Sequence, residues 1–292
     1  MSVRLTRDLN AEGIGSSAIR RLVHEEKLTR VRRGGFVTAD ETADHRQLID
    51  ATMPRLSSGH VLSHASAAWL HGLPTEAAAL SVVTVTKPGR GGNSVGPYLH
   101  RYRTPLPDDD IETADGLERT TLARTVVDVG RCGDLGFAVA AADAALRRGL
   151  SRDQLTAHLQ VSRRHGIKRA RIMAELADPR SESPGESLSR VAIWRLGLPA
   201  PAVQFEIAIG GRTYRTDFAW PDLRVVGEFD GKVKYGALLR PGESADDVVM
   251  REKRREADLR AAGWWVVRWT YADVLKPALL ERLLRPALFR AA

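Results

Sequence analysis

The stretch TDFAWPDLRVVGEFDGK, residues 216–232, decides the fold of the C-terminal part of this 292-residue chain. It predicts two strands joined by a Pro-Asp turn, with aromatic residues before the turn and valine and phenylalanine after it. Alternate side chains of a strand share one face, so Glu228, Asp230 and Lys232 project together. A strand otherwise made of Val and Phe is expected to be buried, where two carboxylates are costly unless a cation or hydrogen-bond donors compensate. The two acids therefore require a partner.

Asp217 lies on the preceding strand, where a hairpin would bring it beside Glu228 or Asp230 across the ladder. Three carboxylates in that position suit Mg²⁺ or Mn²⁺, which would polarise a phosphoryl oxygen and help generate hydroxide from bound water. Lys232 would orient that water or offset developing negative charge. We therefore expect Asp217, Glu228 and Asp230 to be metal ligands and, with Lys232, catalytic residues acting on a phosphodiester bond. The alternatives are an ion-pair network with neighbouring Arg and Lys side chains, or an inactivated relic of such a site.

The elements around these strands predict an α/β sandwich that follows a polar, turn-forming linker at residues 178–183. The expected order is helix 184–196, strand 203–209, strand 214–220, strand 224–232, helix 246–262, strand 264–270 and helix 272–288. The long helix places Arg251, Arg254 and Arg255 on one face, where they would contact DNA phosphates. Solvated pairing with acids one turn away is the alternative for these arginines.

The order Asp217, then Glu228-Phe229-Asp230-Gly231-Lys232, resembles the PD-(D/E)xK nuclease signature. With residues 252–255 and 263–269 it is similar to actinobacterial very-short-patch-repair-like endonuclease domains, over about residues 183 to 290. The resemblance implies a restriction-endonuclease-like nuclease domain at residues 183–292. Two registers are open for the acid that pairs with the lysine, and Asp217 and Asp230 are the favoured core.

The same resemblance adds Glu186, on the first helix of this domain, to the catalytic residues. The alternative for Glu186 is a helix cap. Ser183-Pro184-Gly185-Glu186 matches a capping box with proline at the first helical position, so Glu186 could serve only its own helix.

The first 40 residues predict a helix followed by a basic hairpin. Ile19, Leu22 and Val23 fall on one helical face, and the short strands 28–31 and 36–37 follow it. This order is expected for a winged helix-turn-helix at residues 1–40, with a helix in a DNA groove and a wing on phosphates. The predicted DNA-binding side chains are Arg20, Arg21, Arg30, Arg32 and Arg33. Domain packing is the alternative role for this cluster.

Residues 41–178 predict an α+β region with a helix at 64–70, strands at 82–86 and 99–103, and packed helices after Thr120. The segment SHASAAWLHGL, residues 63–73, resembles abortive-infection type IV antitoxins. So do residues 17–22 and 28–36, Arg124-Thr125 and Asp128, and the resemblance reaches about residue 150. It implies DNA binding and repression of a toxin-gene promoter.

Composition favours a nucleic-acid partner. The chain carries 44 Lys and Arg against 36 Asp and Glu, a net charge of +8, which favours a polyanion. A single cysteine excludes an internal disulfide framework. Neither a secretory signal nor a membrane span is apparent, so we expect a cytoplasmic location without membrane contact.

The sequence as a whole predicts an α/β multidomain protein with a winged helix-turn-helix, an α+β middle region and a restriction-endonuclease-like α/β sandwich. The leading hypothesis is a DNA-binding, divalent-metal-dependent endonuclease in DNA repair or phage defence, with Mg²⁺ or Mn²⁺ as cofactor. The alternative is a non-catalytic DNA-binding transcriptional regulator of the antitoxin type, whose inactive nuclease fold serves dimerisation or partner capture. A homodimer is compatible with both hypotheses.

Overall fold

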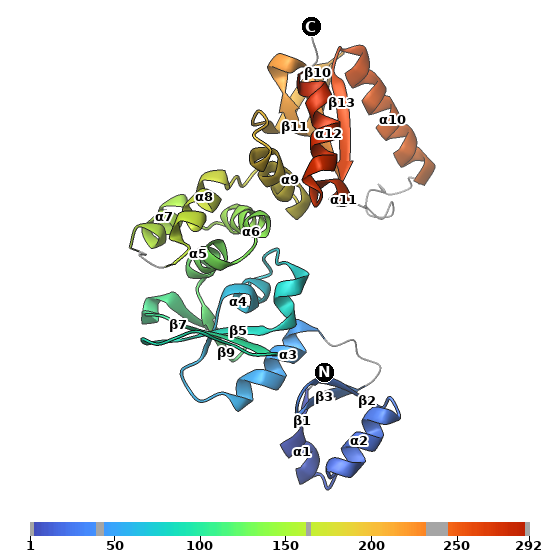
Figure 1. Cartoon of the computed structure of the whole chain (residues 1–292). Coiled ribbons are helices and arrows are strands. Elements are labelled where there is room, and N and C mark those ends of the chain that lie inside the picture. The colour runs from blue at the N-terminus through green and yellow to red at the C-terminus, as the bar shows by residue number, and fades with distance from the viewer. Residues whose placement is uncertain (1–2, 39–43, 162–164, 232–244, 290–292) are drawn as a thin grey trace. The chain divides into compact units, whose positions relative to one another are not determined.

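The computed structural model describes residues 3–38, 44–161, 165–231 and 245–289, whose elements are labelled in Figure 1. The chain divides into two compact units: unit 1 comprises residues 1–134 and 150–171, and unit 2 comprises residues 135–149 and 172–292. The division assigns helix α6 (Leu135–Arg147) to the C-terminal elements, and the predicted domain boundaries at residues 40 and 178 remain predictions. Within the described ranges no helix combines the length and apolar character needed to cross a bilayer.

Unit 1 begins with two short helices and a small antiparallel sheet. α1 (Thr6–Ala11) and α2 (Ser16–His24) precede the hairpin of β2 (Leu28–Arg32) and β3 (Gly35–Thr38), and β1 (Arg4–Leu5) pairs with β3. Leu9, Ile19, Leu28 and Phe36 form the core of this part. The predicted amphipathic helix and hairpin are therefore confirmed, while the winged helix-turn-helix assignment stays a prediction that this element order permits.

The rest of unit 1 is a mixed sheet with helices packed on it. The strand order is β6-β7-β5-β4-β9-β8, with parallel pairs β5/β7 and β4/β9. The strands are β4 (Val61–Leu62), β5 (Val83–Lys87), β6 (Ser94–Val95), β7 (Leu99–Arg103), β8 (Ile111–Ala114) and β9 (Leu117–Thr120). The helices are α3 (His45–Thr52), α4 (His64–Leu70), α5 (Leu122–Cys132), α7 (Arg152–Val161) and the first part of α8 (Ile167–Leu176). Buried Leu48, Ile49, Leu62, Val83 and Val85 form the core here.

Unit 2 is a sheet in the order β10-β11-β12-β13 with helices on both faces. The strands are β10 (Ala202–Ile209), β11 (Arg212–Trp220), β12 (Val225–Asp230) and β13 (Trp265–Thr270), and only the pair β12/β13 in this sheet is parallel. The helices are α6, the end of α8, α9 (Pro184–Arg195), α10 (Ala245–Ala261), α11 (Tyr271–Val274) and α12 (Pro277–Leu288). The predicted order of elements in this part is confirmed up to β13, whereas the single helix predicted at residues 272–288 is two helices, α11 and α12.

Strand alternation gives the sheet of unit 2 two different faces. Phe218 and Trp269 belong to the larger core, together with residues of α9 and α12. Ala219 and Val226 point to the opposite face and pack with Leu259 of α10. By the same alternation, Asp217 and Glu228 belong to the face that α10 covers.

Two glycines allow the close approach of elements in the larger core. A Cβ at Gly185 of α9 would lie 1.9 Å from Cε1 of Phe229, and one at Gly227 of β12 would lie 2.3 Å from Cη2 of Trp269. Both positions therefore require a residue without a side chain. The helix that carries Glu186 is held directly against the strand that carries Glu228.

Candidate functional site

Asp217 and Glu228 lie next to each other at the end of the β11/β12 ladder. The register pairs Phe218 with Gly227, which places Asp217 opposite Glu228, as the hairpin hypothesis predicted. The Oδ2 atom of Asp217 accepts a hydrogen bond of 2.9 Å from the backbone N–H of Phe229. Burial, and then the negative charges of Glu228 and Glu186, raise the pKa of Asp217 to about 7. The structure thus holds carboxylates together at a cost in electrostatic free energy.

The negative charge of Glu228 is partly compensated by Arg255 of α10. Nη2 of Arg255 donates to Oε1 of Glu228 at 2.6 Å, and the side chains are only 15% and 14% exposed. Nη2 of Arg255 also donates to the carbonyl of Arg215 at 2.8 Å. Burial still raises the pKa of Glu228, and the charge of Arg255 opposes that rise. Arg255 is therefore occupied inside unit 2 and does not present a guanidinium group to a phosphate, in contrast to the prediction.

Glu186 serves as the cap of its own helix. Its Oε1 accepts from the hydroxyl of Ser183 at 2.8 Å, and its Oε2 accepts from the backbone N–H of Glu182 at 2.9 Å. Gln204 of β10 donates its side-chain amide to the same Oε2 at 2.9 Å. The capping alternative is therefore what the geometry shows, with a donor from a second element added.

Gln204 is a member of this cluster that the sequence interpretation missed. It falls between the ladder pairs Val203/Phe218 and Phe205/Thr216, opposite Asp217, and its φ of 52° is in the left-handed region. Such a backbone is uncommon for a residue other than glycine, asparagine or aspartate. The alternation of side chains that predicts a strand does not predict a left-handed residue within it, so Gln204 could not be found from the sequence.

Asp230 does not join Asp217 and Glu228. It is the exposed last residue of β12, and the predicted partner Lys232 lies outside the described residues. Across the described part of the chain, no group of three His, Cys, Asp or Glu residues is arranged to hold a metal ion. The predicted triad of Asp217, Glu228 and Asp230 is therefore reduced to a pair. Asp230 still pairs with Thr270 of β13, but it lies beyond the pairing of β12 with β11, and alternation along a strand does not report how far the neighbouring strand extends.

The predicted DNA-binding arginines of α10 differ from one another. Arg254 is exposed and Arg251 is half-buried, whereas Arg255 pairs with Glu228. Arg254 alone of the three thus has the full exposure that phosphate contact requires.

Four of the five N-terminal arginines lie at the surface of unit 1. Arg20 and Arg21 are exposed on α2, and Arg30 and Arg33 are exposed on the hairpin. Gly34, with a φ of 79°, forms the turn that places Arg33 at the hairpin tip. Arg21 has one acidic neighbour, Glu25 at 3.8 Å, and Arg30 lies over the ring of Phe36. These four side chains, which we call the arginine face, share one short segment of the chain.

Arg32 differs from its neighbours because the ladder shifts register between Arg30 and Arg32. Its Nη1 donates to Oγ1 of Thr52 at 2.7 Å, and its guanidinium lies 5.4 Å from the ring centroid of Tyr98. Burial, and then the charge of Arg55, lower the pKa of Arg32. Arg32 therefore has the role in domain packing that was the alternative to DNA binding for the arginine cluster.

A buried ion-pair network joins the helices of unit 1. Asp128, which has no exposed side-chain surface, accepts from Nε of Arg124 at 2.8 Å and from Nη1 of Arg131 at 2.7 Å. Arg124 also donates to Asp110 at 2.7 Å, and Asp110 contacts Nε2 of His158 at 2.9 Å. Burial raises the pKa of Asp128, but His64 and the two arginines outweigh it and hold that pKa below its ordinary value.

Replacing Asp128 by Asn is expected to destabilise unit 1 by about 3–5 kcal/mol, because it removes the buried carboxylate that Arg124 and Arg131 share, and Arg124 then retains its pair with Asp110. Urea denaturation followed by circular dichroism measures the change. Asp153→Asn, on the exposed first turn of α7, is the matched control and should change stability little. Equal stability of the two variants would contradict the importance given to this network.

Replacing Asp217 by Asn is expected to stabilise unit 2 at pH 8 and to have little effect at pH 4. The folded pKa of about 7 lies above the ordinary 3.8, so the folded state is penalised progressively as pH rises from about 4 to about 7. Asparagine removes the charge and keeps an oxygen for the N–H of Phe229. Thermal denaturation across this pH range, with exposed Asp222→Asn as control, tests it. If the stability difference between Asp217→Asn and the wild type does not grow with pH, the inference that burial and the neighbouring acids raise the pKa of Asp217 is contradicted.

Residues 60–176 match the family model described as the AbiEi antitoxin C-terminal domain. This segment runs from the strand β4 to the end of α8, contains His64 and Asp128, and is less than half of the chain. The match supports the predicted resemblance to antitoxins in the middle of the chain. It gives no support to the resemblance to very-short-patch-repair-like endonucleases.

Two proteins of Mycobacterium tuberculosis are each 35% identical to this chain over 167 residues: Uncharacterized protein MT2308 (strain CDC 1551 / Oshkosh) and Uncharacterized protein Rv2248 (strain ATCC 25618 / H37Rv). The aligned region is 56% of this chain, and the chain spans 59% of the length of each relative. The crystal structure of the RV2827C protein from Mycobacterium tuberculosis is similar at a TM-score of 0.41 and 18% identity, over 60% of this chain and 72% of that one.

Proposed function

We propose that this chain is a DNA-binding regulator of the antitoxin type, in which the arginine face of unit 1 contacts the DNA backbone. The observation that carries the proposal is the exposure of Arg20, Arg21, Arg30 and Arg33 on a helix and the hairpin that follows it. A helix with an adjacent hairpin is the arrangement by which winged helices place one element in a groove and the other on phosphates. The similarity of residues 60–176 to an antitoxin domain supports the same role.

The arginine face carries more positive than negative charge. The acids of this segment are Glu25 and Glu26, and Glu25 already contacts Lys27 at 2.9 Å. A surface of this kind attracts a polyanion through counterion release, so the affinity falls as the salt concentration rises. The promoter of a toxin gene is the DNA that an antitoxin-type regulator would bind.

Arg20→Ala and Arg33→Ala are each expected to weaken binding to duplex DNA, and to reduce the slope of log affinity against log salt by about one if each arginine contacts one phosphate. Fluorescence anisotropy measures the affinity and its salt dependence, with a labelled duplex from the DNA directly upstream of the gene for this chain and a range of salt concentrations. Arg90→Ala removes an exposed cation from the loop between β5 and β6 and is the control. If all three variants bind as the wild type does, the arginine face is not the DNA contact.

The acidic pair of unit 2 favours a second candidate function, the hydrolysis of phosphodiester bonds. Strongly raised carboxylate pKa values are concentrated at functional sites, and Asp217 has one. Mg²⁺ is often held by one or two carboxylates together with waters and substrate phosphates, a pattern that Asp217 and Glu228 fit. When bound there, Mg²⁺ or Mn²⁺ would polarise a phosphoryl oxygen. The hydrogen bonds from Phe229 to Asp217 and from Arg255 to Glu228 fix the orientation of the two acids.

Cleavage is expected only with Mg²⁺ or Mn²⁺ present. Asp217→Asn and Glu228→Gln should each reduce it by about 10–100-fold or more, because even the loss of a residue that orients a metal ligand costs about that much. Gel assays of supercoiled plasmid and linear duplex, with chelator as blank and Asp222→Asn as control, measure it. Wild-type protein that cuts neither substrate would eliminate this second candidate. The regulator proposal is unaffected by that result, because it rests on other residues.

A further inference from the structure

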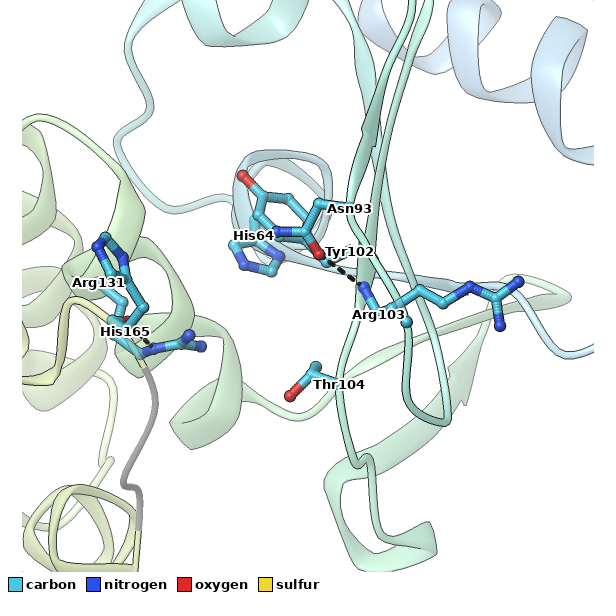
Figure 2. A pocket seen from close by; sticks show the side chains of 8 residues that line it. His64, Asn93, Tyr102, Arg103, Thr104, Arg131 and His165 are labelled. Carbon is cyan, nitrogen blue, oxygen red and sulfur yellow. Dashed lines mark hydrogen bonds between the residues drawn. The ribbon is translucent and has the colours of Figure 1, made fainter.

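Unit 1 contains a cavity of about 330 Å³ that has no part in either proposed function. It is lined by His64, Gly91, Asn93, Tyr102, Arg103, Thr104, Arg131 and His165. These side chains supply cationic groups and hydrogen-bond donors, and no carboxylate is among them. Figure 2 shows His64, Thr104 and Arg131 around one space, whereas the guanidinium of Arg103 points away from it.

His64 is the unusual residue of this cavity. It is 4% exposed, and its φ of 49° places it in the left-handed region at the first residue of α4. Its ring stacks on Tyr102, with centroids 3.6 Å apart and an angle of 10° between the planes. Its Nε2 atom is buried and has no hydrogen-bond partner among the described residues. A buried polar atom in this state costs free energy, and a bound ligand would recover that cost.

The hydrogen bonds behind His64 connect its ring to Ser63 and, through Ser63, to Thr86. The Oγ1 atom of Thr86 donates to Oγ of Ser63 at 2.9 Å, and Oγ of Ser63 lies 2.9 Å from Nδ1 of His64. Oγ of Ser63 has one hydrogen to donate and two lone pairs, so it can accept from Thr86 and still donate to Nδ1 of His64. With Ser63 donating to Nδ1, the proton of a neutral imidazole resides on Nε2 and is available as a donor to a ligand. Burial lowers the pKa of His64 to about 4, so the ring is neutral at pH 7.

Arg131 supplies the positive charge of the cavity and is fixed in place by two contacts. Its Nη1 donates to Asp128 at 2.7 Å, and its Nε donates to the carbonyl of His165 at 3.0 Å. Its side chain is only 10% exposed. A guanidinium that is oriented in advance loses little conformational entropy when it binds an anion.

We propose that this cavity binds the oxyanion group of a small molecule, with His64 Nε2, the Thr104 hydroxyl and the Arg131 guanidinium as donors. Phosphate and carboxylate groups share the chemistry that this donor set recognises. The site is separate from the arginine face and from the acidic pair. A bound oxyanion would contact α4 through His64, α5 through Arg131 and, through Thr104, the residue that follows β7.

The test is titration of the full chain with inorganic phosphate and, separately, with acetate, at constant ionic strength maintained with sodium chloride. Isothermal titration calorimetry measures the affinity, and ¹⁵N NMR of the histidine rings reports the environment of Nε2. We expect phosphate or acetate to bind with a shift of the Nε2 resonance of His64. Binding of phosphate alone identifies a phosphate-bearing ligand, and binding of acetate identifies a carboxylate ligand. Binding of neither anion would overturn the proposal.

His64→Asn is the decisive variant. Asparagine tolerates the left-handed backbone and can keep the hydrogen bond to Ser63, but it has no atom in the position of Nε2. We expect its affinity for the anion to fall by about tenfold or more, with an unchanged circular dichroism spectrum. Thr104→Val, which keeps the side-chain shape without the hydroxyl, gives an independent reading should His64→Asn fail to fold. His24→Asn, on the exposed surface of α2, is the control. Equal affinity of the folded cavity variants and the control would overturn the proposal.

Discussion

Unit 1 depends on the carboxylate of Asp128, which lies fully buried between the guanidinium groups of Arg124 and Arg131. A buried ion pair of this kind contributes little net stability, but losing one partner is strongly unfavourable, so the three groups hold one another in place. Through Arg124 the network reaches Asp110 and His158, and through Arg131 it reaches the backbone of His165. The cavity beside His64 inherits its charge and its rigidity from this arrangement.

Unit 2 also holds buried charged side chains together, but negative charge is in excess there. Glu228 pairs directly with Arg255, while Asp217 accepts a hydrogen bond from the backbone of Phe229 and lies near two further acids. Excess negative charge is therefore concentrated at one end of β11 and β12. Such a cluster suits a bound cation or a proton, and the two experiments on Asp217 separate a pH-dependent structural role from a catalytic one.

The arginine face follows a different principle, because its charges are useful only when they are exposed. Ile19 packs into the core and fixes which side of α2 is buried, so Arg20 and Arg21 lie on the exposed side of the helix. On the hairpin, the register shift between Arg30 and Arg32 leaves Arg30 exposed and directs Arg32 into packing with Thr52. The proposed DNA contact and the packing of unit 1 thus use neighbouring arginines for separate purposes.

The sequence by itself determined the local patterns. Alternation aligned Glu228 and Asp230 on one face, and the expected hairpin brought Asp217 beside one of them. The apolar positions of residues 16–26 predicted α2, and Ser183 with Glu186 offered the cap of α9 as one of two alternatives. Tertiary structure alone decided the pairing of Arg255 with Glu228, the removal of Arg32 from the surface, the exposure of Asp230 and the unsatisfied Nε2 of His64. Periodicity reports which face of an element is apolar, since neighbouring residues fix that. The partner of a charge is set by whatever packs against it, and Arg255 lies 27 residues away from Glu228.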